Sequence, residues 1–249
     1  MIDNIFDSHA HYDDEQFDGD RDELLRSLPS KGVCAVINCA SDLKSSATSA
    51  ELSEKYPFFW CACGVHPHEA EKELKTADIN KVEKRIVNFT EKKKCVAIGE
   101  IGLDYHYDFS PRELQKEIFE LQLKLSKELD LPVIVHDREA HEDTMTLLKK
   151  YRPKGVVHCF SGMYIGLGGA VTFKNAKKPV AVAAETDIDR ILLETDCPYM
   201  APVPFRGTRC SSDMIAYSAQ TIASVKNMDV QTLVDAATEN TKRLFGIEF

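Results

Sequence analysis

Short apolar runs alternate with amphipathic segments along the whole chain. Residues 33–40 (V-C-A-V-I-N-C-A) are apolar almost throughout, which is typical of a parallel strand buried on both faces. Between such runs, apolar residues recur at helical spacing, as Ile79, Val82 and Ile86 do. The pattern predicts eight strands, most of them separated by helices. The first strand ends at residues 5–6. The other seven span residues 33–40, 58–65, 96–100, 133–136, 156–160, 164–173 and 191–194.

Several helix ends are marked by capping residues. Ser110, Pro111 and Glu113 predict a helix that starts with a capping box, and Pro132 ends it. The stripe expected to face the core of this helix is Leu114, Ile118, Leu121, Leu125 and Leu129. Near the end of the chain, Asp229 is expected to cap a helix over residues 230–245 and Gly246 to end it.

The order of these elements predicts the fold class. Alternating strands and helices over 249 residues favour an α/β fold, a (β/α)8 TIM barrel with parallel strands inside and helices outside. A doubly wound open sheet is the competitor, but no G-x-G-x-x-G follows the first strand. No repeat or linker marks a boundary, so residues 1–249 are expected to form a single domain.

Composition and charge limit the cellular locations and the binding partners that we expect for the protein. No apolar run approaches the roughly 20 residues needed to span a bilayer, and the N-terminus is acidic rather than a secretory signal. The formal net charge of −9 excludes a generally basic surface, so a phosphate substrate would need metal ions or a few placed cations. We expect a cytoplasmic protein, with a nuclear location also open; a monomer is compatible with the sequence, which does not fix the oligomeric state.

The eight cysteines are scattered rather than arranged in a disulfide framework, which favours reduced thiols. Cys61-Ala62-Cys63 has the spacing of a soft-metal half-site, but no second pair completes it. We therefore interpret these two cysteines as core packing.

Candidate metal ligands stand where the predicted strands end. In a barrel, these ends surround one pocket. His9 and His11 are two residues apart and would point the same way from an extended segment. The full set at strand ends is His9, His11, His66, Glu100, His136, His158 and Asp196. A single histidine at a strand end is more often structural, but a set of this size predicts a metal site.

Imidazole and carboxylate ligands without thiolate suit Zn²⁺, Mn²⁺, Fe²⁺ or Mg²⁺. The set is too large for one tetrahedral ion, so two divalent ions (Mg, Mn or Zn) about 3.5–4 Å apart are the simplest arrangement. Glu100 is the natural bridging carboxylate.

Six motifs in order along residues 6–200 resemble the TatD family of metal-dependent deoxyribonucleases. They are F-D-S-H-A-H, G-V-H-P-H, I-G-E-I-G-L-D-Y, P-V-I-V-H-D-R-E-A, V-V-H-C-F-S-G and L-L-E-T-D-C-P-Y-M. Residues 238–245, T-E-N-T-K-R-L-F, also look like the C-terminus of that family. One departure from the family begins at Pro204. The family pattern is P-x-R-G-x-x-N-E-P, whereas this chain has P-F-R-G-T-R-C-S-S over residues 204–212 and therefore lacks the Asn-Glu-Pro.

The resemblance implies an amidohydrolase-like barrel that hydrolyses DNA phosphodiester bonds, often as a 3′–5′ exonuclease. It implies that His9, His11 and Asp196 bind one metal, that His136 and His158 bind the other, and that Glu100 bridges them. The catalytic residues that it implies are Asp196, His66 and Glu100. Asp196 would orient or deprotonate the attacking water, and His66 would contact phosphate or protonate the leaving group.

Three further residues in the motifs, Glu194, Asp104 and Arg138, are explained by structural salt bridges as well as by chemistry. The same metal centre would also serve a hydrolase of a small ester, amide or phosphoester, and that alternative stays open. A non-catalytic metal-binding scaffold usually lacks a ligand, and no ligand is missing from this set.

The junction at Gly162-Met163 is too short for the predicted topology. The strands over residues 156–160 and 164–168 should be parallel neighbours, but only Ser161, Gly162 and Met163 join them, a reach of about 10 Å. We expect that residues are missing from the sequence at this point, and suspect a similar splice near Pro179.

Overall fold

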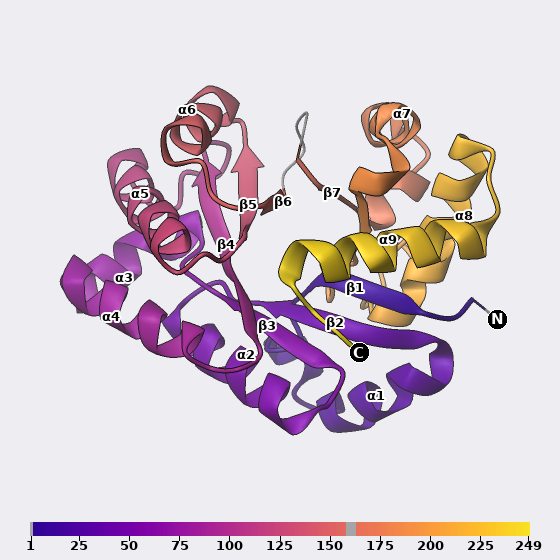
Figure 1. The fold of residues 1–249 in the computed structure, drawn as a ribbon, viewed down its shortest axis with the longest axis horizontal. Helices are drawn as coiled ribbons and strands as arrows, with labels where there is room; N and C mark the ends of the chain where they lie inside the picture. Colours follow the sequence, from indigo (N-terminus) through magenta and orange to yellow (C-terminus); the bar gives the residue numbers. More distant parts are fainter. Residues whose placement is uncertain (1, 158–162) are drawn as a thin grey trace. The chain divides into compact units, whose positions relative to one another are not determined.

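The structure, a computed structural model, describes residues 2–157 and 163–249. The chain divides into two compact units, one made of Met1–Asn38 with Cys159–Phe249 and the other of Cys39–His158. We call them the terminal unit and the central unit. Strands and helices alternate in both (Figure 1). Within the described ranges, no helix is long and apolar enough to cross a membrane.

The terminal unit contains two parallel strand pairs. β1 (Ile5–Ala10) pairs with β2 (Val33–Cys39), and β7 (Ile165–Leu167) pairs with β8 (Ile191–Leu193). A parallel bridge between Ala10 and Cys197 joins the end of β1 to the segment after β8. The helices of this unit are α1 (Arg21–Ser27), α7 (Lys177–Glu185), α8 (Ile215–Lys226) and α9 (Val230–Phe245). α9 packs on β1 and β8, and its place beside β1 can be followed in Figure 1.

The central unit is a run of parallel strands in chain order. β3 (Phe59–Cys63), β4 (Cys95–Asp104), β5 (Val133–Arg138) and β6 (Val156–Val157) each pair with the next. The helices are α2 (Leu43–Lys55), α3 (Ala70–Thr76), α4 (Ile79–Thr90), α5 (Arg112–Glu128) and α6 (His141–Tyr151). α2 and α4 contact β3, and α4 and α5 contact β4.

Short 3-10 turns complete both units. They are η1 (Glu15–Phe17), η2 (Leu28–Lys31), η3 (Pro67–Glu69), η4 (Gly169–Thr172), η5 (Ile188–Arg190) and η6 (Ser212–Met214).

Local sequence explains most of the element boundaries. The residues of β1 and β8 are all buried, as parallel strands require. Asp229 caps α9 by accepting a hydrogen bond from Thr232 N–H at 2.9 Å, and Gly246 ends it in the left-handed region, as predicted. Pro179 lies in the first turn of α7, where a missing N–H group is tolerated.

Several predicted element bounds differ in the structure. β1 does not end at Phe6 but continues through His9 to Ala10, and β5 extends past His136 to Arg138. β4 does not end at Glu100 but continues to Asp104, because Ile101 and Leu103 are also buried. The predicted strand over 164–173 is only β7 followed by η4. Pro111, not Ser110, occupies the N-cap of α5.

Ser110 fails to cap α5 because its hydroxyl is used elsewhere. It donates to His68 O at 2.8 Å and accepts from Glu71 N–H at 3.0 Å. The buried face of α5 is also more polar than predicted, because Gln115 and Gln122 are fully buried there, while Leu129 is partly exposed. The predicted ligand His158 and the predicted break at Gly162-Met163 lie outside the described residues.

Gly102 allows β4 and β5 to approach where the site is built. Its φ is +140°, and a Cβ atom at this position would lie 2.0 Å from the carbonyl oxygen of His136, its register partner on β5. Neither strand can shift cheaply, because the obstructing atom belongs to backbone. Only glycine therefore fits at this position.

Gly102→Ala should destabilise the protein by at least about 3 kcal/mol, because the substitution combines an unfavourable φ with a backbone clash. The measurement is the free energy of unfolding from urea titrations. Gly19→Ala is the matched control, since no atom lies within 4 Å of a Cβ there. Equal stability of the two variants would contradict the close approach of β4 and β5.

Candidate metal centre

The terminal unit brings together three of the predicted ligands. His9 lies on β1, His11 follows it by two residues, and Asp196 follows β8. The Nε2 atoms of His9 and His11 are 3.1 Å apart, and Asp196 Oδ1 lies 3.2 Å from His11 Nε2 and 4.0 Å from His9 Nε2. Three ligand atoms thus converge on one point.

Backbone contacts hold this group in place. Asp196 N–H donates to His9 O at 2.9 Å, and His11 N–H donates to Cys197 O at 2.8 Å. Asp196 adopts a φ of +60°, an uncommon conformation for a residue with a side chain. The two exchanged hydrogen bonds fix the ends of β1 and β8 relative to each other within this unit.

Asp7 lies on β1, two residues before His9, and its side chain binds the same strand ends. It was not predicted as a site residue. Its fully buried carboxylate accepts from the N–H groups of His9 (3.2 Å) and Thr195 (3.1 Å) and from the hydroxyls of Thr195 and Ser212 (both 2.6 Å). Burial raises the pKa of Asp7 to about 6 in spite of these hydrogen bonds. The sequence signal was an acidic residue inside a strand that is otherwise buried.

The distances in this group suit a cation. Ligand atoms that surround a tetrahedral ion at 2.0–2.1 Å are about 3.3–3.4 Å apart. The observed separations of 3.1, 3.2 and 4.0 Å bracket that value. Two imidazole nitrogens and a carboxylate oxygen are also a donor set that Zn²⁺ or Mn²⁺ accepts. The residues therefore fit a metal ion.

The central unit contributes a second group around His136. Glu100 on β4 and His136 on β5 lie on paired strands. His136 Nδ1 is 3.3 Å from Glu100 Oε1, while its Nε2 is 2.9 Å from Asp104 Oδ2. Burial lowers the pKa of His136, but the carboxylates of Glu100 and Asp104 outweigh this effect and the net shift is upward.

Asp104 controls which nitrogen of His136 faces Glu100. Both ring nitrogens face carboxylates, which can only accept, and the contact of Nε2 with Asp104 (2.9 Å) is shorter than that of Nδ1 with Glu100 (3.3 Å). The shorter contact favours a neutral ring that keeps its proton on Nε2 and carries its lone pair on Nδ1. Histidines that bind metals usually donate their other N–H group to a carboxylate in this way. His136 is therefore oriented as a ligand through Nδ1, on the side of Glu100.

Asp104 is itself fully buried and has every acceptor position filled. Oδ1 accepts from the N–H groups of His106 (3.0 Å) and Tyr107 (2.9 Å), and Oδ2 also lies 2.9 Å from His68 Nε2. Burial raises the pKa of this carboxyl group, but the hydrogen bonds from Tyr107, His136 and His68 outweigh it, so the net shift is downward. The group stays ionised at neutral pH.

Two histidines complete the second group. The ring of His66, after β3, lies 4.4 Å from the rings of both His68 and His136. Two groups of three residues each bring one donor atom per residue within 4.8 Å of one another. The first group is His66, Glu100 and His136, and the second is His68, Asp104 and His136. His68 was missed in the sequence, although it ends the motif G-V-H-P-H.

Imidazoles and carboxylates gathered at the carboxyl ends of parallel strands define the class of metal-dependent hydrolases. The chain belongs to the TatD family: residues 6–246 match the family model described as TatD related DNase. The family predicted from the motifs is thereby confirmed.

Named relatives span nearly the whole chain. The uncharacterized metal-dependent hydrolase YabD of Bacillus subtilis is 40% identical over 258 residues, covering 98% of this chain and 99% of the relative. The 3′-5′ ssDNA/RNA exonuclease TatD of Escherichia fergusonii is 30% identical, covering 98% and 100%.

Solved structures confirm the fold class. The crystal structure of YjjV, a TatD homologue from Escherichia coli K12, matches with a TM-score of 0.88 and 31% identity over 100% of both chains. A TatD family hydrolase from Entamoeba histolytica matches with a TM-score of 0.84 and 24% identity, covering 98% and 99%, which shows the fold alone. The α/β class with the parallel strands of a TIM barrel agrees with the prediction.

Asp104→Asn should weaken the binding of one metal equivalent by about 10- to 100-fold. The amide keeps the two backbone hydrogen bonds but turns a donor toward His136 Nε2, which forces the proton onto Nδ1. Metal titration by calorimetry measures the affinity, and ¹⁵N shifts of the imidazole in metal-free protein report the tautomer. Asp143→Asn, an exposed carboxylate paired with Tyr105 and Lys116, is the control. Unchanged affinity and tautomer in Asp104→Asn would contradict this role.

Proposed function

We propose that this protein is a metal-dependent nuclease that hydrolyses phosphodiester bonds of nucleic acid from the 3′ end. The observation that carries the proposal is the convergence of imidazole and carboxylate donors within each unit, with His136 held through Nε2 by Asp104 and its Nδ1 turned toward Glu100. The E. fergusonii relative is named a 3′-5′ ssDNA/RNA exonuclease, which supports this substrate class.

The proposed ligand roles follow the family motifs. His9, His11 and Asp196 form one ligand set, His136 and His158 form the other, and Glu100 is shared by both. Two divalent cations, when bound, would lower the pKa of the attacking water and stabilise charge on the phosphate. Asp196 would orient that water or accept its proton.

His66 is proposed to protonate the leaving oxygen or to contact the phosphate. Its Nδ1 accepts a hydrogen bond from His68 N–H at 3.2 Å, so the neutral ring carries its proton on Nε2. Nε2–H is therefore the group that can donate to a phosphate or leaving oxygen.

An exposed aromatic pair beside the second group favours nucleic acid over a small ester. Tyr107 and Phe109 are 47% and 64% exposed, and their rings stack with centroids 5.3 Å apart. Phe109 lies 4.8 Å from the ring of His68, and the Arg138 guanidinium lies 4.6 Å from the centre of the Tyr107 ring. Nucleobases stack on such rings without regard to sequence, and a nearby arginine suits phosphate.

The direct test is digestion of end-labelled single-stranded and duplex DNA with Mg²⁺ or Mn²⁺, beside assays with small esters and lactones. We expect products shortened progressively from the 3′ end. Hydrolysis of small esters without any cleavage of DNA or RNA would overturn the proposal in favour of a small-molecule hydrolase.

Glu100→Gln should reduce turnover at least about 100-fold while the fold survives, because the shared negative charge is lost. Steady-state rates on an oligonucleotide and the metal content of the purified variant check this prediction. Activity within a few-fold of the parent protein would exclude a bridging role for Glu100.

His66→Ala is the contrasting variant. If His66 acts on the substrate and not as a ligand, the variant should keep both metal equivalents and lose rate, by about 10²- to 10⁴-fold if it is a general acid. Elemental analysis separates the two roles, since the loss of one equivalent would make His66 a ligand instead.

Tyr107→Leu and Phe109→Leu should each raise KM for an oligonucleotide about tenfold, because stacking contributes about 1–3 kcal/mol per base. Turnover of bis(p-nitrophenyl) phosphate should stay the same, because this small substrate does not extend from the metal centre to Tyr107 and Phe109. Tyr217→Leu replaces an exposed tyrosine of the terminal unit and is the control. Equal losses on both substrates would show that the pair only supports the fold.

A further inference from the structure

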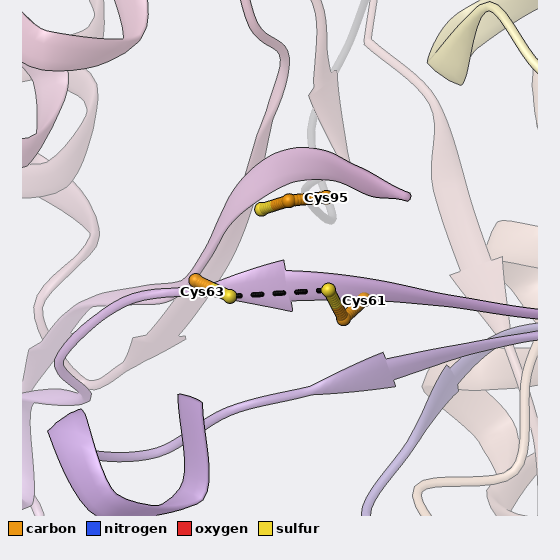
Figure 2. A group of neighbouring side chains, drawn as sticks. All are labelled: Cys61, Cys63 and Cys95. Carbon is orange, nitrogen blue, oxygen red and sulfur yellow. Dashed lines mark hydrogen bonds between the residues drawn. The ribbon is translucent and has the colours of Figure 1, made fainter. Parts of the chain in front are cut away.

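Three cysteines of the central unit form a cluster apart from the hydrolytic residues. Cys61 and Cys63 lie two residues apart on β3, and Cys95 begins β4 as the register partner of Cys61 (Figure 2). Cys61 and Cys63 are fully buried and Cys95 is 6% exposed. The Sγ atoms lie within 4.8 Å of one another, and those of Cys61 and Cys63 are 4.0 Å apart. The sequence showed only the first pair, because Cys95 lies more than thirty residues downstream.

The cluster is separate from the candidate metal centre. Cys95 and Glu100 are five residues apart on β4, a separation of about 16 Å at the rise of an extended strand. Cys95 is at the amino end of β4, whereas Glu100 and Asp104 are in its carboxyl half. On β3 the separation is one of faces, because Cys63 ends that strand only three residues before His66. Cys63 Sγ lies 3.8 Å from the Ser46 carbonyl of α2, and the cluster packs against Ala50 of α2 and Phe89 of α4.

The spacing and the surroundings suit a three-coordinate soft cation. Three sulfur atoms around an ion in a plane, each at about 2.3 Å, are about 4.0 Å apart. The cluster packs against Ala50 and Phe89. The other donors beside it are oxygens, which soft cations do not prefer: the Lys94 carbonyl 3.6 Å from Cys61 Sγ, the Ser46 carbonyl 3.8 Å from Cys63 Sγ and the Ser53 hydroxyl. Sulfur donors in an apolar setting select soft cations over Mg²⁺ or Mn²⁺. We propose that Cys61, Cys63 and Cys95 form a binding site for one soft cation of the copper(I) class.

A lysine beside the cluster would favour a bound complex. The Lys94 ammonium attracts negative charge on Cys61. A thiolate is the form that binds a metal, and the lysine offsets part of the negative charge left on the complex.

The alternative is that the thiols only fill the core, since buried cysteines pack as small hydrophobic residues. The test is an anaerobic titration of the reduced full-length protein with Cu(I), in competition with a chromophoric Cu(I) chelator. We expect thiolate-to-copper absorption that saturates at one equivalent, a signal that imidazole and carboxylate ligands do not give.

Cys63→Ala and Cys95→Ala should weaken Cu(I) binding by at least about 100-fold. Cys63→Val is a second variant that keeps the core filled, and circular dichroism checks that each variant folds. Cys34→Ala removes a half-buried thiol outside the cluster and should bind as the parent does. Failure of the parent protein to compete for Cu(I), or Cu(I) binding by folded Cys63→Val at parental affinity, would leave the cluster as core packing alone.

Discussion

The hydrogen bond between Asp104 and His136 is the interaction on which the chemistry of the central unit depends. An imidazole on a strand can offer either nitrogen, and which one carries the lone pair depends on what the other nitrogen meets. Asp104 decides this because its carboxylate is buried, ionised and anchored by two backbone N–H groups. Helix α5 also holds Asp104 in place, because Gln115 accepts from Asp104 N–H at 2.9 Å and donates to Asp104 O at 3.1 Å.

Each unit thus contains a buried carboxylate that organises its histidines. Asp7 performs this task in the terminal unit, where it fixes the backbone of His9 and Thr195, and Asp104 does so in the central unit by binding the imidazole rings directly. Burying a charge is costly unless all of its acceptor positions are used, and both groups meet that condition. The hydrogen bonds outweigh the cost of burial for Asp104, whose pKa is lowered, and offset it only in part for Asp7, whose pKa is raised to about 6. In both cases they hold candidate ligands in one geometry.

The sequence predicted what depends on local pattern. Buried strands, the Asp229 cap and the Gly246 terminus follow from neighbouring residues and were confirmed. Ser110 was misjudged because its hydroxyl has partners on His68 and Glu71, about forty residues earlier in the chain, and no local rule contains them. The fourth strand was predicted to end at Glu100, whereas β4 continues to Asp104 and carries both acidic residues.

In the candidate site, too, single residues could be predicted from the local sequence, whereas their contacts with distant residues could not. Histidines and acids at strand ends could be found one by one. Asp104 meets His136 only when β4 and β5 are paired in register, and it meets His68 only because β3 pairs with β4. Cys95 likewise meets Cys61 only through the pairing of β3 with β4.

Parallel pairing is therefore the source of both donor groups. It aligns the beginnings of neighbouring strands with one another and their ends with one another, so residues at similar positions along different strands become neighbours. In the central unit it brings Cys61 beside Cys95 at the start of β4, and it brings His136 beside Gly102, between Glu100 and Asp104. The sulfur donors pack against α2 and α4, as the contacts with Ser46, Ala50 and Phe89 show. Soft and hard donors therefore form separate groups, and each group can select its own class of cation.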